Sequence, residues 1–134
     1  MNLAVDFDAF PRRPRILIVE DEAMLAFALE EFLTDAEFEI SGVAGRLENA
    51  LAMIEIGGFD AAILDANLAG VSAGPAAAAL RTRGLPFLVL SGYMASQHHV
   101  DFVGAVCLQK PCPSDHVVRT LLSLLPGGGG RTVS

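Results

Sequence analysis

The sequence predicts an α/β domain, a doubly wound parallel sheet of five strands with helices on both faces. Five short apolar runs alternate along the chain with segments whose apolar residues recur at helical spacing. The runs are continuously apolar, which indicates strands buried on both faces, as in the middle of a parallel sheet. The 134 residues, just over half of them apolar, suffice to bury one such core without disulfides or metals.

The first half of the chain supplies two strands and two helices. A β-branched run over 15–19 predicts the first strand. A helix is expected over 23–36, because its apolar residues fall on one face and its acids lie outside that face. A short second strand is expected over 38–44. The second helix carries its apolar residues over 47–54 and is stopped by Gly57-Gly58.

The second half continues the alternation. A third strand over 61–64 ends abruptly at Asp65, and a Gly-rich loop over 69–75 follows it. An alanine-rich helix is expected over 75–83, with small residues that let it lie close to the sheet. The remaining elements are expected in this order: a fourth strand over 86–90, a polar helix over 95–103, a fifth strand over 105–109 and a last helix ending at 125.

Composition and charge limit the classes of function. We expect a lead-in segment over 1–14, one domain over 15–125 and a flexible Gly-rich tail over 126–134. The formal charge of −7 disfavours a nucleic-acid surface, and no apolar run approaches the length of a membrane span, so we expect no membrane insertion. Cys107 and Cys112 form neither a metal motif nor a disulfide framework, which is typical of a cytoplasmic protein.

Chemically competent side chains end four of the five predicted strands. Glu20 and Asp21 follow the first strand, Asp65 the third, Ser91 the fourth, and Lys110, the only lysine in the sequence, the fifth. Because the carboxyl ends of parallel strands lie along one edge of a sheet, where open α/β folds bind their ligands, these side chains can converge. Asp65 is the candidate reactive centre.

Each of these residues, taken singly, also has an ordinary structural interpretation. Asp21 suits the cap of the helix that follows it. Ser91-Gly92 suits a plain turn, and Lys110 suits a solvated loop. Their joint occurrence at successive strand ends is what favours a functional site.

In this order and on these strands, Glu20-Asp21, Asp65, Ser91 and Lys110-Pro111 resemble the receiver domain of two-component response regulators. The resemblance covers residues 15–125. It implies a flavodoxin-like fold with strand order 2-1-3-4-5 and Mg²⁺-dependent transfer of a phosphoryl group from a sensor histidine kinase to Asp65. It also implies that the chain is not a dedicated enzyme, and that it catalyses its own phosphotransfer and autodephosphorylation.

The resemblance gives each residue a role. Asp65 is the phosphoacceptor, a nucleophile that forms an acyl phosphate. Ser91 and Lys110 bind the phosphoryl group, the first through its hydroxyl and the second through its positive charge. The metal is Mg²⁺, with Mn²⁺ as an alternative ion. Its ligands are Glu20, Asp21, Asp65 and the backbone carbonyl of Asn67.

Three positions depart from the family's pattern. Glu20 stands where an aspartate is common, and its extra methylene moves the carboxylate by about a bond length, so we expect an altered metal affinity or choice of ligand. The usual proline after the Asp65 loop is absent. Cys107 replaces the aromatic switch residue of the fifth strand, and Tyr93, directly after Ser91-Gly92, is an alternative switch aromatic.

Tyr93, Pro86-Phe87 and the stretch 65–70 are together similar to the subgroup nicknamed FATGUY receivers, although Leu90-Ser91 departs from its Ala-Thr. This similarity implies a single-domain receiver that serves HWE-type histidine kinases in general stress or light signalling. We expect it to signal through contacts with a downstream protein partner. Movement of Ser91 toward the phosphoryl group would reposition Tyr93 and the segment 95–103.

Other functions are compatible with parts of the sequence. Two alternatives share this fold. One is a receiver-like binding module with weak or no phosphorylation, which Glu20 favours, and the other is a phosphate sink for a histidine kinase. A haloacid-dehalogenase-type phosphatase would need a second acid at position 67, where the chain has Asn67. A flavodoxin-like cofactor carrier would need a phosphate-cradling loop after the first strand, where Glu20-Asp21-Glu22 repel an anion.

Overall fold

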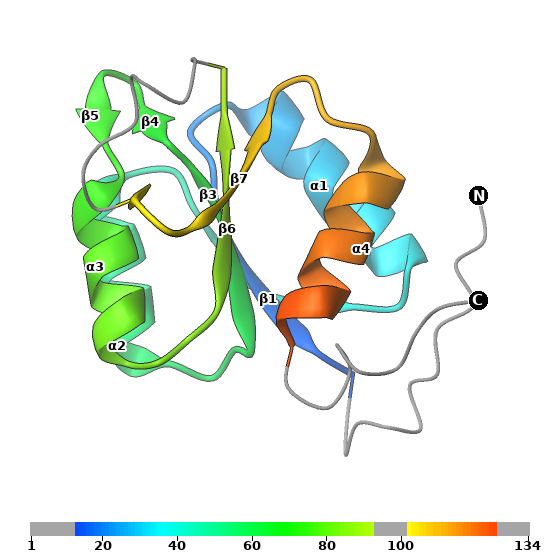
Figure 1. Ribbon diagram of the computed structural model, residues 1–134, viewed down its shortest axis with the longest axis horizontal. Coiled ribbons are helices and arrows are strands. Elements are labelled where there is room, and N and C mark those ends of the chain that lie inside the picture. Colours follow the sequence, from blue (N-terminus) through cyan, green and yellow to red (C-terminus); the bar gives the residue numbers. More distant parts are fainter. Residues whose placement is uncertain (1–12, 93–101, 126–134) are drawn as a thin grey trace.

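A parallel sheet forms the centre of the molecule (Figure 1). The computed structural model describes residues 13–92 and 102–125. In this part of the chain the five-stranded sheet has the order β2-β1-β3-β6-β7, and every neighbouring pair is parallel. Its strands are β1 (Arg15–Val19), β2 (Glu39–Ala44), β3 (Ala61–Asp65), β6 (Phe87–Ser91) and β7 (Val106–Gln109). Counted within this sheet, the order is the expected 2-1-3-4-5, so the predicted fold class is confirmed.

In the described part of the chain, helices cover both faces of the sheet (Figure 1). One face carries α1 (Ala23–Asp35) and α4 (Ser114–Leu124), and the other carries α2 (Leu47–Ile56) and α3 (Gly74–Thr82). None of the described helices is long and apolar enough to cross a membrane.

The core consists of two apolar layers, one on each face of the sheet. Alternate residues of a strand point to opposite faces, so Leu17 joins the layer under α2 and α3, whereas Ile16 joins the layer under α1 and α4. Both side chains are fully buried. Ala76 and Ala77 of α3 are also fully buried, which lets this helix lie close to the sheet as its small residues predict. The layers pack the strands on both faces, and the site is built on the strand ends.

The segment after β3 differs from the expected Gly-rich loop, because part of it forms a short antiparallel hairpin. Its strands are β4 (Asn67–Leu68) and β5 (Val71–Ser72). The two turn residues, Ala69 and Gly70, have φ values of +52° and +91°, and such backbone angles at both positions match the right-handed twist of a tight hairpin. A weak apolar pattern of two residues per strand gives no strand signal in the sequence, so the hairpin was not predicted.

Several expectations fall on parts of the chain outside the described residues. These are the lead-in segment up to residue 12, Tyr93, most of the polar helix expected over 95–103, and the tail from residue 126.

Candidate functional site

The site lies at the carboxyl edge of the sheet, where four strands deliver the predicted residues. Glu20 follows β1, Asp65 ends β3, Ser91 ends β6 and Lys110 follows β7. Strand register aligns them, since Asp65 pairs with Leu90 of β6 and Ser91 pairs with Gln109 of β7. The Lys110 backbone N–H donates to the Ser91 carbonyl at 2.8 Å, which joins these two strand ends.

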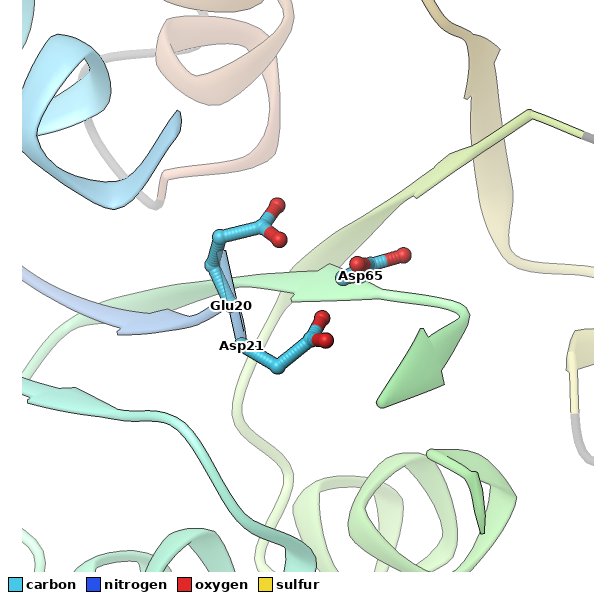
Figure 2. A group of neighbouring side chains, drawn as sticks. All are labelled: Glu20, Asp21 and Asp65. Atoms are coloured by element: carbon cyan, nitrogen blue, oxygen red, sulfur yellow. The ribbon is translucent and has the colours of Figure 1, made fainter. Parts of the chain in front are cut away.

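Three carboxylates converge at this edge. Glu20, Asp21 and Asp65 each offer an oxygen that lies within 4.8 Å of the other two, and Figure 2 shows the three side chains directed toward a shared space. Glu20 and Asp65 are buried, at 3% and 7% exposure, whereas Asp21 is half-buried. Close negative charges in a poorly hydrated site repel one another, and hard oxygen donors of this kind are the ligands that Mg²⁺ prefers.

Lys110 supplies a positive charge beside two of the acids. Its Nζ lies 3.2 Å from Glu20 Oε1 and 3.2 Å from Asp65 Oδ2. The lysine side chain is 23% exposed, so its ammonium is partly withdrawn from water. The sequence predicted that Lys110 and Asp65 converge, but it did not predict the ion pair between Lys110 and Glu20.

Backbone donors hold the remaining oxygens of the two buried acids. The Glu22 N–H donates to Glu20 Oε2 at 3.1 Å, and the Asn67 N–H donates to Asp65 Oδ1 at 3.2 Å. In each carboxylate, one oxygen therefore accepts a hydrogen bond from a backbone N–H and the other forms an ion pair with Lys110. Sequence reasoning missed the Glu22 donor, because a backbone N–H leaves no residue-type signal.

Burial changes the protonation of the site. Desolvation of the carboxyl group, helped by the negative charge of Asp65, raises the pKa of Glu20 from 4.5 to about 7; the Glu22 N–H and Lys110 oppose this rise. Burial lowers the pKa of Lys110, but the charges of Asp65 and Glu20 outweigh it and raise that pKa above its usual 10.5. Near neutral pH a cation that requires ionised Glu20 therefore competes with a proton.

Asn67 and Ser91 complete the predicted set. Asn67 is half-buried, and its side-chain Oδ1 accepts a hydrogen bond of 2.7 Å from the Gly70 N–H, which ties it to the turn of the hairpin. Gly70, three residues after Asn67, is the sequence signal that could have indicated a turn at this place. Ser91 is 1% exposed and lies at the strand end beside Asp65. The structure thus brings Glu20, Asp21, Asp65 and Lys110 together, with Ser91 on the adjacent strand.

Comparison with known proteins gives a family match. A family model described as the response regulator receiver domain matches residues 16–121. Comparison with curated protein sequences gave no match.

Solved structures include several similar chains. SdrG from Sphingomonas melonis Fr1 is 40% identical, with a TM-score of 0.73 over 84% of this chain and 96% of its own. The BeF₃-activated conformation of SdrG, from Pseudomonas melonis Fr1, is 39% identical, with a TM-score of 0.72 over 87% of this chain and 99% of its own. The response regulator TrrA from Thermotoga maritima, in complex with Mg²⁺-BeF, is 27% identical, with a TM-score of 0.75 over 84% of this chain and 99% of its own.

Proposed function

The chain belongs to the response regulator receiver domain family, and from this premise we propose that it accepts a phosphoryl group from a histidine kinase on Asp65. The observation that carries the proposal is the position of Asp65. It ends the central strand β3, shares a space with the carboxylates of Glu20 and Asp21, and has one oxygen 3.2 Å from the Lys110 ammonium. A nucleophile, a set of metal ligands and a counter-charge for a phosphoryl group therefore meet at one point.

The proposed reaction is an in-line displacement at phosphorus. A carboxylate oxygen of Asp65 attacks the phosphorus of a phosphohistidine, the P–O bond forms, and the P–N bond breaks as the imidazole of the kinase leaves. The product is an acyl phosphate on Asp65, which water hydrolyses in the later autodephosphorylation. Lys110 balances the negative charge on one side of the phosphoryl group, and the Ser91 hydroxyl donates a hydrogen bond on another.

The donor set at this edge fits Mg²⁺, and Mn²⁺ accepts the same oxygen ligands. The ligands we propose are the carboxylates of Glu20, Asp21 and Asp65 and the backbone carbonyl of Asn67. The fit rests on the cluster itself, in which three acids lie within 4.8 Å of one another and one lysine offsets only part of their charge. When bound, Mg²⁺ neutralises charge on the phosphoryl oxygens. TrrA in complex with Mg²⁺-BeF supports this by analogy.

The proposed output is a change in protein contacts. Phosphorylation adds about −1.5 to −2 charge, which attracts Lys110 and the Ser91 hydroxyl. The hydrogen bond between their backbones means that a shift at one strand end reaches the other. Tyr93 directly follows Ser91-Gly92 and is the proposed switch aromatic. We infer a cytoplasmic receiver of the FATGUY subgroup, served by an HWE-type kinase, and the residues that support this are Tyr93, Pro86-Phe87 and the stretch 65–70.

A phosphotransfer assay tests the proposal. Wild-type protein is incubated with acetyl phosphate, and then with the histidine kinases of the source organism, in Mg²⁺ or in EDTA. We expect labelling in Mg²⁺, little in EDTA and none in Asp65→Asn. Asp35→Asn, the same change at the end of α1, is the matched control and should label like wild type.

One observation favours a second function, the receiver-like binding module. Glu20 is engaged by Lys110 and has a raised pKa, and both features weaken a metal site. If wild type and Asp65→Asn stay equally unlabelled in Mg²⁺ with every phosphoryl donor, the chain is a binding module and not a phosphoacceptor. If wild type is labelled and then loses phosphate rapidly back to a kinase, the chain acts as a phosphate sink.

A further inference from the structure

We propose that Lys110 acts as an internal counter-cation shared by Glu20 and Asp65 in the metal-free protein, and that a divalent ion displaces its ammonium from Glu20. The inference rests on the proposed function and concerns how the same site is regulated. It makes Glu20 a positioning residue for Lys110 in addition to its role as a metal ligand.

The geometry of the ammonium group is the first support. Lys110 Nζ lies 3.2 Å from an oxygen of each buried acid, so it bridges them symmetrically. The side chains of Glu20 and Asp65 are only 1% and 9% exposed, which leaves little water to replace the lysine as a partner. An ammonium in this position does electrostatically what a metal ion would do there, since it stabilises two close carboxylates.

The length of Glu20 is the second support. An aspartate at this position would withdraw the carboxylate by about one bond length, beyond hydrogen-bond distance of Lys110 at the present backbone position. The other Glu20 oxygen accepts the Glu22 N–H, so the carboxylate is held between two donors. The extra methylene that distinguishes glutamate therefore creates the second contact of Lys110.

The charges of the two cations are the third support. Mg²⁺ binds carboxylate oxygens at about 2.1 Å. If Lys110 kept its present contacts with the same oxygens, the two cations would be at most about 5 Å apart, where their repulsion is strong in a poorly hydrated site. Metal binding and the Lys110–Glu20 ion pair therefore oppose each other.

The displacement has a consequence for the phosphoryl site. An ammonium has three donors, and the contact with Glu20 uses one of them in the metal-free protein. Release from Glu20 leaves that donor available for a phosphoryl oxygen while Lys110 stays beside Asp65. Metal and phosphoryl group then bind with positive coupling, because the metal removes the competing partner of the lysine.

Nuclear magnetic resonance of the lysine side chain tests this directly. Lys110 is the only lysine in the sequence, so labelling lysine with ¹³C and ¹⁵N gives a single side-chain signal that needs no assignment. In wild type we expect the chemical shift of this signal to change as Mg²⁺ is added and to reach a plateau at saturating Mg²⁺. In Glu20→Asp, which keeps the charge but loses the reach, the metal-free signal should already be displaced and the Mg²⁺-induced change should be at least halved. An unmoved Lys110 signal at saturating Mg²⁺ would overturn the proposal.

Calorimetry with Mg²⁺ alone is the second measurement. At pH 8 we expect Lys110→Gln to bind Mg²⁺ at least about fivefold more tightly than wild type, within the usual range of coupling between sites. Arg119→Gln makes the same charge change on the exposed side of α4, and it should alter the affinity less than about twofold. Equal or weaker binding by Lys110→Gln would contradict the displacement.

These measurements separate the inference from the proposed function. Neither requires phosphorylation, so a protein that takes up no phosphoryl group can still show the displacement. Conversely, a protein that is labelled on Asp65 while its Lys110 signal ignores Mg²⁺ keeps the proposed function and loses the inference.

Discussion

Replacing Glu20 by glutamine tests whether burial holds a costly charge at the sheet edge. The pKa of Glu20 is raised from 4.5 to about 7. Because the folded-state pKa exceeds the unfolded one, the stability that this group contributes is fully present below pH 4.5 and is lost as the pH rises through about 7. Glutamine resembles the protonated acid and does not titrate, so the variant avoids this loss.

The size of the effect follows from the shift in pKa. Each pKa unit corresponds to about 1.4 kcal/mol, so the full shift would cost at most about 3–4 kcal/mol. Glutamine also weakens the contact with the Lys110 ammonium, which lies 3.2 Å from Glu20 Oε1, and this loss reduces the gain. We therefore expect Glu20→Gln to gain about 1–3 kcal/mol over wild type between pH 4.5 and pH 8.

Urea unfolding in EDTA at both pH values measures this difference. Glu55→Gln, the same substitution at an exposed position of α2, is the matched control and should lie within about 0.5 kcal/mol of wild type. Saturating Mg²⁺ should reverse the advantage of Glu20→Gln at pH 8, since the metal stabilises the charged wild type. A stability difference between Glu20→Gln and wild type that is the same at pH 4.5 and pH 8 would refute the reasoning.

Three further predictions concern the metal and the fold. Mg²⁺ affinity should fall as the pH drops below about 7, by up to tenfold per pH unit, because a proton competes with the metal for Glu20. Calorimetry at pH 6 and pH 8 checks this, and equal affinities at the two pH values would contradict it. Ala69→Gly should stabilise the protein by about 0.5–1 kcal/mol in urea unfolding, because φ at Ala69 is +52° and glycine adopts this angle without strain. The same change in the middle of a helix, Ala78→Gly in α3, should destabilise the protein by about 1 kcal/mol. A loss of stability in both variants would be inconsistent with the strained turn. Ala77→Leu should cost about 1–3 kcal/mol in the same assay, because Ala77 is fully buried between α3 and the sheet, and a neutral result would argue against close packing there.

Much of the fold could be predicted because its strands are continuous apolar runs. A run such as Ile16 to Val19 has few alternatives to a strand buried on both faces, and Asp65 marks the end of β3 by an abrupt change in polarity. The β4–β5 hairpin escaped prediction because two residues per strand carry no periodicity, and its turn was visible only as Ala69-Gly70.

The candidate site could be predicted as a set of strand ends but not as a network. Knowing that β1 and β7 end at one edge does not reveal that Lys110 reaches Glu20, because β3 and β6 lie between those strands. Strands are spaced by about 4.8 Å, so the contact depends on two extended side chains meeting above the sheet edge. The backbone donor of Glu22 likewise becomes visible only in three dimensions.

Locating the phosphoryl group on the chain tests the central claim most directly. After reaction with acetyl phosphate in Mg²⁺, borohydride reduces an aspartyl phosphate to homoserine, which mass spectrometry of the resulting peptides places at a single position. We predict homoserine at position 65 in wild type, and unmodified protein in Asp65→Asn and in EDTA. Homoserine at another acid, or none in wild type under conditions that label a known receiver, would contradict the account.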